Sequence, residues 1–306
     1  MAIFILMLKI AFDSIFAHSL PPGHRFPMAK YELLPQQLLY EGTVEEVNFF
    51  SSPKIEESIV LDVHDPSYFN RLTTLELSKR EQRITGFPHN AQLIEREMRI
   101  MEGTRRCAEF ALEHGVSMNI AGGTHHAFTN KGEGFCLLND QAIAAMWLLN
   151  SNKAQRILII DLDVHQGNGT AEIFKDEKRV FTFSVHGKNN YPLKKEQSDL
   201  DVELEDGIKD LSYLEKVKRN LEPVIESFNP DFLFFQSGVD ILETDKLGRL
   251  GVSIDGCKKR DSYILQLAHD LKLPIVCSMG GGYSPQLKFI IEAHANTYRM
   301  AQEIFF

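Results

Sequence analysis

Two carboxylates and an imidazole follow an apolar run near the middle of the chain. Asp161, Asp163 and His165 alternate with apolar residues directly after the run 157–160, just before two glycines. In an extended chain alternate side chains share one face, so these three polar groups would point the same way. Buried charges need partners, and a divalent metal ion suits carboxylates and imidazole together. Taken alone, the pattern fits a capped strand end with exposed aspartates equally well.

Three further segments carry polar or glycine-rich groups directly after strand-like apolar runs. In open, mostly parallel sheets, ligands bind beyond the carboxyl ends of the strands. Convergence of four such strand ends therefore favours a functional site over a capped strand end. The further groups are His125 and His126 after the run 116–120, Asp240 after 232–235, and Tyr283 after 275–279 and three glycines.

The aspartates and the imidazole are suitable ligands for a catalytic metal ion. Asp163, His165 and Asp240 would supply three ligands and leave a coordination position open for water or substrate, as catalytic zinc sites do. This mixed oxygen and nitrogen set suits Zn²⁺ or Fe²⁺ better than an ion that prefers thiolates. We expect zinc, with iron as the alternative.

The remaining groups match the other needs of metal-assisted hydrolysis. His126 would accept a proton from water, and His125 would be a second imidazole oriented by Asp161. Tyr283 would donate its hydroxyl to a developing oxyanion. The alternatives are one packed and one solvated histidine ring, and a buried aromatic residue at a turn.

Alternating strand-like and helix-like segments would position these groups. Such alternation predicts an α/β fold, with a mostly parallel sheet covered by helices on both faces. Strand-like patterns cover 1–12, 59–63, 116–120, 157–160, 180–185, 232–235 and 275–279. Helix-like patterns cover 31–40, 90–114 with Asn90 as N-cap, 139–149 opened by Asn139 or Asp140, 171–174, 214–228 with a kink at Pro223, 255–271, and a segment from Pro285 onward.

Length and charge restrict the class of protein. The 306 residues suit one large domain, so we expect a single catalytic domain over 1–306. A net charge of -9 argues against non-specific nucleic-acid binding, which requires Lys and Arg to neutralise phosphates.

The cysteines and the first residues bear on location. The four cysteines, Cys107, Cys136, Cys257 and Cys277, form no C-x-x-C pair, which favours a reducing, cytoplasmic setting. The apolar segment 1–12 lacks a basic start and is too short to span a membrane. We interpret it as the first strand, with residues 1–8 as the start of that strand or an N-terminal extension. Met7 is an alternative natural start.

Two irregular segments complete the prediction. The loop 18–27 has three prolines and one glycine, and its His18 and His24 are interpreted as solvated loop residues. The segment 186–210 lacks periodicity and is predicted to be a long functional or mobile loop.

Five motifs, in this order and approximate spacing, resemble the zinc-dependent histone deacetylase superfamily over nearly the whole chain. Segments 202–207 and 238–248 look like its class IV branch, and the loop 23–28 is similar to bacterial members of that branch. The motifs are Gly122-Gly123-Thr124-His125-His126-Ala127, Gly134-Phe135-Cys136, the run 161–169, Gly238-Val239-Asp240 and Gly280-Gly281-Gly282-Tyr283.

The resemblance implies an arginase-like α/β fold and hydrolysis of an acyl group from an amine, usually an ε-acyl-lysine. It repeats the assignments made above for the metal ligands, the histidine pair and Tyr283. It adds Asn168 as the partner of His126, and a structural K⁺ or Na⁺ near Asp161. The implied substrate-binding residues are Gly134, whose carbonyl would accept from the substrate amide, Phe135, Tyr191 and Leu247 as channel walls, Gly281, Gly282, and Arg25 in the internal cavity where the released acid collects.

Two departures from the family pattern matter: the first biases His126 less strongly towards its charged form, and the second bears on substrate preference. Asn168 replaces the aspartate that some members place beside the second histidine, and Pro192-Leu193 replaces the more usual Pro-Gly. No acidic residue matches the rim aspartate that grips peptide backbone. Four alternatives stay open: hydrolysis of small acylated amines such as acetylpolyamines, long-chain acyl substrates, a catalytically silent acyl-lysine binding module, and an arginase-like binuclear hydrolase.

Overall fold

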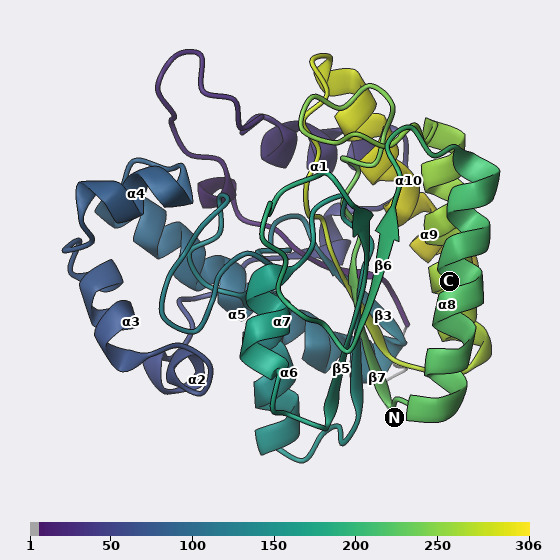
Figure 1. Cartoon of the computed structure of the whole chain (residues 1–306), viewed down its shortest axis with the longest axis horizontal. Helices are drawn as coiled ribbons and strands as arrows, with labels where there is room; N and C mark the ends of the chain where they lie inside the picture. Colours follow the sequence, from purple (N-terminus) through teal and green to yellow (C-terminus); the bar gives the residue numbers. More distant parts are fainter. Residues whose placement is uncertain (1–5) are drawn as a thin grey trace.

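Eight parallel strands form one sheet in the computed structural model, which describes residues 6–306. Their order across the sheet is β2-β1-β3-β8-β7-β4-β5-β6, and Figure 1 labels β3, β7, β5 and β6 among them. The predicted α/β class is confirmed, and every neighbouring pair of these strands is parallel. The strands are Lys9–Ala11 (β1), Phe49–Phe50 (β2), Val116–Asn119 (β3), Ile157–Asp161 (β4), Val180–Gly187 (β5), Leu200–Leu204 (β6), Phe232–Gln236 (β7) and Ile275–Ser278 (β8).

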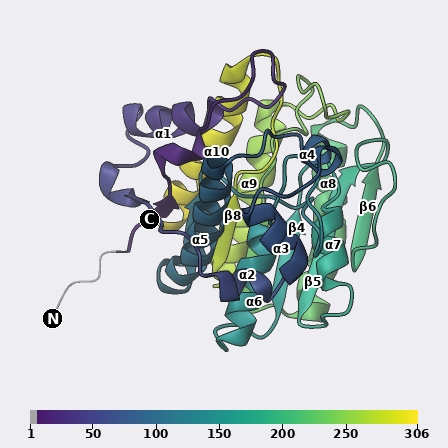
Figure 2. The ribbon, with the colours of Figure 1, turned by 90° about the vertical axis from the view of Figure 1, so that its left-hand side faces the viewer.

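Helices cover both faces of the sheet, as predicted (Figures 1 and 2). One layer contains α5, α6 and α7, and the other contains α8, α9 and α10, with α1 packed on α10. The helices are Lys30–Tyr40 (α1), Glu57–Leu61 (α2), Pro66–Thr73 (α3), Lys79–Thr85 (α4), Ala91–His114 (α5), Asp140–Asn150 (α6), Asn168–Phe174 (α7), Asp210–Phe228 (α8), Ile254–Asp270 (α9) and Leu287–Phe305 (α10).

The central strands β4 and β7 place the functional segments. Every residue of both strands is buried, as expected for parallel strands covered on both faces, which explains their continuous apolar sequences. Their register pairs Asp161 with Gln236. Strands β4 and β7 therefore end at the same edge of the sheet, and the residues that follow each strand lie close together.

Polar capping residues set the starts of the long helices. The Asn90 side chain accepts from the Leu93 N–H at 2.8 Å at the start of α5. Asn139 accepts from the Ala142 N–H at 3.1 Å at the start of α6. A side-chain acceptor here satisfies a backbone donor that has no partner within the helix. Both predicted helix starts are confirmed.

Two predicted segments are wrong. Residues 59–63 are not a strand, because residues 57–61 form α2 and bury Val60; so short an apolar run does not distinguish the two structures. The segment 186–210 is not all loop, because it contains the edge strand β6, in which Val202 pairs with Val185. The alternation of Leu200, Val202 and Leu204 with acidic residues was the signal for that strand.

The first strand is shorter than predicted. Strand β1 covers only Lys9–Ala11, and residues 1–5 of the predicted segment lie outside the described part of the chain. Among residues 6–306, no helix is both long and apolar enough to cross a membrane.

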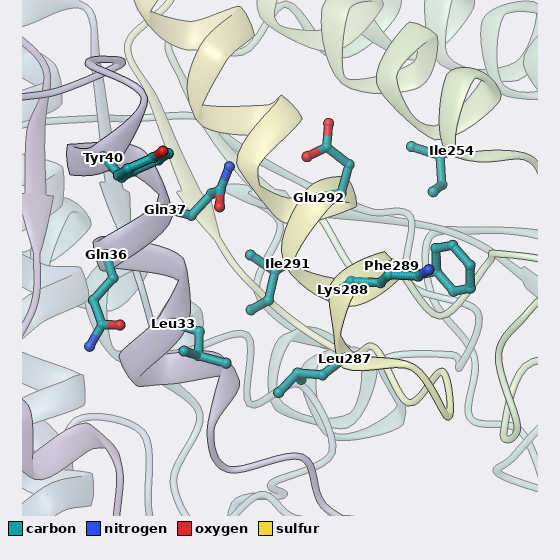
Figure 3. A pocket seen from close by; sticks show the side chains of 10 residues that line it. All are labelled: Leu33, Gln36, Gln37, Tyr40, Ile254, Leu287, Lys288, Phe289, Ile291 and Glu292. Carbon is teal, nitrogen blue, oxygen red and sulfur yellow. The ribbon is translucent and has the colours of Figure 1, made fainter.

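A surface groove lies between α1 and α10. Figure 3 shows Leu33, Gln37 and Tyr40 of α1 facing Ile291 and Glu292 of α10 across it. Its volume is about 830 Å³, and its lining includes none of the predicted site residues.

Arg260 of α9 forms hydrogen bonds with the backbone segments that follow β4 and β7. Its guanidinium is completely buried and donates to the backbone carbonyls of Gly238 at 2.6 Å and of Leu162 at 3.2 Å. Its Nε donates to the carboxylate of Asp261 at 2.8 Å, and Thr297 of α10 donates to the same carboxylate. One side chain therefore fixes the backbone that follows β4 and the backbone that follows β7.

Replacing Arg260 with methionine should destabilise the protein by about 3–5 kcal/mol, because Asp261 and the carbonyl groups would remain buried without their partner. Urea unfolding followed by circular dichroism measures this change. Arg156→Met is the matched control, since Arg156 is exposed at the start of β4. An Arg260→Met variant as stable as the control would contradict this role.

Candidate active site

Asp163, His165 and Asp240 form a compact buried cluster beyond the ends of β4 and β7. Their ligand atoms all lie within 4.8 Å of one another. His165 Nδ1 is 3.1 Å from Asp163 Oδ1 and 3.1 Å from Asp240 Oδ2. Within residues 6–306, this is the one group of three or more His, Cys, Asp or Glu side chains close enough to share an ion.

The electrostatics of this cluster favour a cation. Burial and the neighbouring carboxylate of Asp163 raise the pKa of Asp240 to about 7. Burial alone would lower the pKa of His165, but its hydrogen bonds to Asp163 and Asp240 raise it to about 10. Two carboxylates so close together in the interior need positive charge between them. Two carboxylates and one imidazole nitrogen therefore fit a divalent ion.

Glycines bring the backbone close to both carboxylates. A Cβ atom at Gly238 would overlap the Asp163 carboxylate, and one at Gly281 would overlap the Asp240 carboxylate. Gly281 also donates its N–H to Asp163 Oδ2 at 2.9 Å. A residue with a side chain at either position would displace a metal ligand.

The histidine pair lies beside this cluster, and the two rings are 4.1 Å apart between centroids. His125 Nδ1 lies 2.7 Å from Asp161 Oδ2, the contact predicted for orienting His125, and His126 Nδ1 lies 2.7 Å from Asn168 Oδ1. Both oxygens are acceptors, so each Nδ1 carries a hydrogen, and Nε2 is an acceptor only in a ring that is neutral.

The two histidines differ in charge. Burial lowers the pKa of His125, but Asp161 and Asp163 outweigh it and raise the pKa to about 9. Burial, followed by the neighbouring His125 and His165, holds the pKa of His126 well below its usual value. His125 therefore favours its charged form, and His126 is a neutral imidazole that can accept a proton.

Two cavities meet at the histidines. The outer cavity opens to solvent and has a volume of about 200 Å³, whereas about 40 Å³ of the inner cavity is accessible to the centre of a water molecule. The outer cavity includes the predicted channel residues Tyr191 and Leu247. Five residues line both cavities and form the boundary between them: His126, Gly134, Phe135, His165 and Tyr283.

Tyr283 contributes a hydroxyl group to this boundary. Burial and the carboxylates of Asp240 and Asp163 hold the pKa of Tyr283 well above its usual value, so the hydroxyl keeps its proton. Its backbone N–H donates to Asp245 at 2.6 Å, which fixes the residue after the glycine run. Tyr283, with a hydroxyl group that stays protonated, therefore lines the same boundary as His126 and His165.

A family model described as the histone deacetylase domain matches residues 24–298. The chain belongs to the histone deacetylase family. The predicted superfamily is therefore confirmed, whereas its class IV branch stays a prediction.

The relatives of this deacetylase-family chain include bacterial and plant proteins. An uncharacterized protein of Picosynechococcus sp. is 39% identical over 94% of this chain and 95% of that protein. Histone deacetylase 2 of Arabidopsis thaliana is 29% identical over 85% of this chain and 70% of that protein. A crystal structure of an HDAC homolog complexed with SAHA has the same fold, with a TM-score of 0.84 and 23% identity over 97% of this chain and 84% of that chain.

Glu133 is a residue of this deacetylase-family site that the sequence did not single out. Its Oε1 accepts from Asn168 Nδ2 at 2.6 Å, while Asn168 Oδ1 faces His126 Nδ1. The carboxylate therefore determines which way the Asn168 amide points. Glu133, Asn168 and His126 therefore form a chain of hydrogen bonds from carboxylate to amide to imidazole.

Arg25 does not lie in the inner cavity, and that prediction is wrong. It is exposed and lines the outer cavity, with its guanidinium carbon 5.0 Å from the centroid of the Phe135 ring. Arg96 lines the inner cavity instead. Lys30 is completely buried and donates to the carbonyl of Gly280, another lining residue, at 2.9 Å. Burial lowers the pKa of Lys30 to about 8.

Gly282 and the two loop histidines also differ from expectation. Gly282 is buried facing Val239 and Ile290 and lines neither cavity. His18 is buried and packs against Phe87, at 5.5 Å between ring centroids. His24 donates from Nε2 to the Gly86 carbonyl at 2.8 Å. Neither histidine is a solvated loop residue, because both hold the loop 18–27 against the segment after α4.

Replacing Asp240 with asparagine should reduce metal retention to less than about a tenth of the wild-type content, because the site loses one of two charged ligands. Elemental analysis of the purified proteins measures the metal. Asp176→Asn is the matched control, since Asp176 is exposed after α7. Stoichiometric metal in the Asp240→Asn variant would remove Asp240 from the ligand set.

Proposed function

We propose that this protein is a zinc-dependent lysine deacetylase or deacylase, which hydrolyses acyl-lysine amides in peptides or proteins. Family membership indicates a deacetylase-type hydrolase in general, and the substrate and the ion belong to the proposal. One observation carries it: His126 and Tyr283 line the boundary of the two cavities together with His165, one of the three candidate metal ligands.

Asp163, His165 and Asp240 would hold the ion. Zinc is the proposed ion, and Fe²⁺ suits the same donor set. When bound, the ion would supply Lewis-acid activation of water and of the acyl carbonyl. The structural K⁺ or Na⁺ expected near Asp161 is also part of the proposal.

The side chains of the chain itself would manage protons and charge. His126 would accept the proton of the attacking water at Nε2, because its Nδ1–H is directed to Asn168. His125, charged and held by Asp161, would raise the local positive potential. Tyr283 would donate its hydroxyl to the developing oxyanion, and His126 or His125 would then protonate the departing amine.

The outer cavity suits the apolar stem of an acyl-lysine. Phe135, Tyr191 and Leu247 would form its walls, and the Gly134 carbonyl would accept from the substrate amide N–H. The inner cavity, with about 40 Å³ accessible to the centre of a water molecule, favours a short acyl group such as acetyl over a long chain.

A panel of substrates tests the proposal. Zinc-loaded protein should hydrolyse an acetyl-lysine peptide faster than the corresponding long-chain acyl peptide, and faster than an acetylpolyamine. Faster turnover of the acetylpolyamine would favour the alternative of a small-amine amidohydrolase. Binding of acyl-lysine peptide without turnover would favour the silent binding module.

Tyr283→Phe should lower kcat by about 10² to 10³, because one oxyanion donor is lost while the ring keeps its packing. Steady-state kinetics on the acetyl-lysine peptide measures this effect. Tyr40→Phe is the matched control, since the Tyr40 side chain is 91% exposed on α1 and remote from the site. A Tyr283→Phe variant with near wild-type kcat would remove Tyr283 from the mechanism.

Glu133→Met should lower kcat by about tenfold with KM within about twofold, because the Asn168 amide loses the acceptor that orients it toward His126. Glu133→Gln keeps an acceptor oxygen and should restore most of kcat. Equal kcat values for the Met variant and the wild type would show that Glu133 does not position Asn168.

The partners and location follow from the same proposal. The substrate would be an acylated peptide, protein or amine, and the protein would not bind nucleic acid directly. A cytoplasmic location agrees with four buried cysteines that carry no disulfide.

A further inference from the structure

Two exposed cationic residues belong to or adjoin the lining of the outer cavity, in a chain whose net charge is -9. Arg25 lines the cavity itself and stacks over Phe135. Lys246 is exposed and adjoins Leu247, a lining residue on another loop. Neither cation forms an ion pair with any residue between 6 and 306. Their charges are therefore available to a molecule that binds at the mouth.

A second hollow extends this cationic surface along α4. It has a volume of about 620 Å³, and its lining contains Lys79 and Arg83 but no carboxylate. Residues adjacent in sequence connect it to the outer cavity: His24 with Arg25, and Arg83 with Ile84. Within the described chain, Lys79 and Arg83 form no ion pair either.

Three carboxylates near these cations are hydrogen-bonded or paired with other groups. Asp245 accepts from the backbone N–H groups of Leu247, Gly248 and Tyr283. Glu133 accepts from Asn168 at 2.6 Å. On α4, Glu81 forms an ion pair with Arg71. None of these three carboxylates forms an ion pair with Arg25, Lys246, Lys79 or Arg83.

We propose that the mouth selects acidic peptides, in which aspartate or glutamate residues flank the acylated lysine. The proposal rests on the proposed function and specifies its substrate class. Complementary charge at a rim accelerates encounter with the matching partner and repels partners of like charge. A free polyamine carries the same sign as the rim and is disfavoured for that reason.

Three acetyl-lysine peptides of equal length test this selectivity, with the flanking residues acidic, neutral or basic. At low ionic strength, kcat/KM of the zinc-loaded protein should be at least about fivefold higher for the acidic than for the basic peptide. Salt at about 0.5 M screens interactions between exposed charges, so it should reduce the difference in kcat/KM between the acidic and basic peptides to within about twofold. Equal values for all three peptides at low salt, or a preference for the basic peptide, would overturn the proposal.

Substitutions of Arg25 distinguish the effect of its charge from the effect of its packing on Phe135. Arg25→Gln should lower kcat/KM by about three- to fivefold more for the acidic peptide than for the neutral peptide. Arg25→Lys keeps the charge but loses the planar group over Phe135, and should retain the preference for the acidic peptide. Arg156→Gln, at the opposite edge of the sheet, should change none of the three values. An Arg25→Gln variant that discriminates as well as wild type would exclude Arg25 from selection.

Binding distinguishes failure of this inference from failure of the proposed function. If no peptide is hydrolysed, the proposed function fails, and fluorescence anisotropy with the same three peptides still measures the selectivity of the mouth. Tighter binding of the acidic peptide would then support the inference alone. Turnover of the peptides without any charge preference would support the proposed function and refute the inference.

Discussion

The hydrogen bonds of the Arg260 guanidinium to the backbone carbonyls after β4 and β7 are the interaction on which the site depends. Asp163 follows Leu162 directly, and Asp240 lies two residues after Gly238. The guanidinium thus sets the separation of two carboxylates that it does not touch. The hydrogen bond from Thr297 to Asp261 connects this set of contacts to α10. A planar group with several donors can satisfy divergent carbonyls in this way, and lysine cannot.

A second set of hydrogen bonds orients the metal ligands across the strands. Asp240 accepts from the Val164 N–H at 2.9 Å, and Asp163 accepts from the Gly281 N–H at 2.9 Å. Each carboxylate is therefore held by the backbone of a different strand end. Rotation of either side chain would break a buried hydrogen bond, so the ligand positions are established by the fold before any ion binds.

Sequence reasoning predicted which residues lie close together where each follows the end of a strand. Asp163, His165 and Asp240 were expected to converge because parallel strands present their carboxyl ends at one edge, and the structure brings them together. It failed for Arg25, since a loop rich in proline carries no periodic signal for the direction of a side chain. Arg96 and Arg260 were overlooked, although each occupies a position on the buried stripe of its helix, where a charge is unexpected.

Strand β8 has a consequence for how the chain is made. It is the last strand in the sequence, yet it lies between β3 and β7 and joins the two halves of the sheet. During synthesis β3 and β7 are made before β8, so the edge that each presents to β8 has no partner until the last strand has emerged. During that interval the polypeptide would be especially vulnerable to self-association, and chaperones that cover exposed strand edges would matter most.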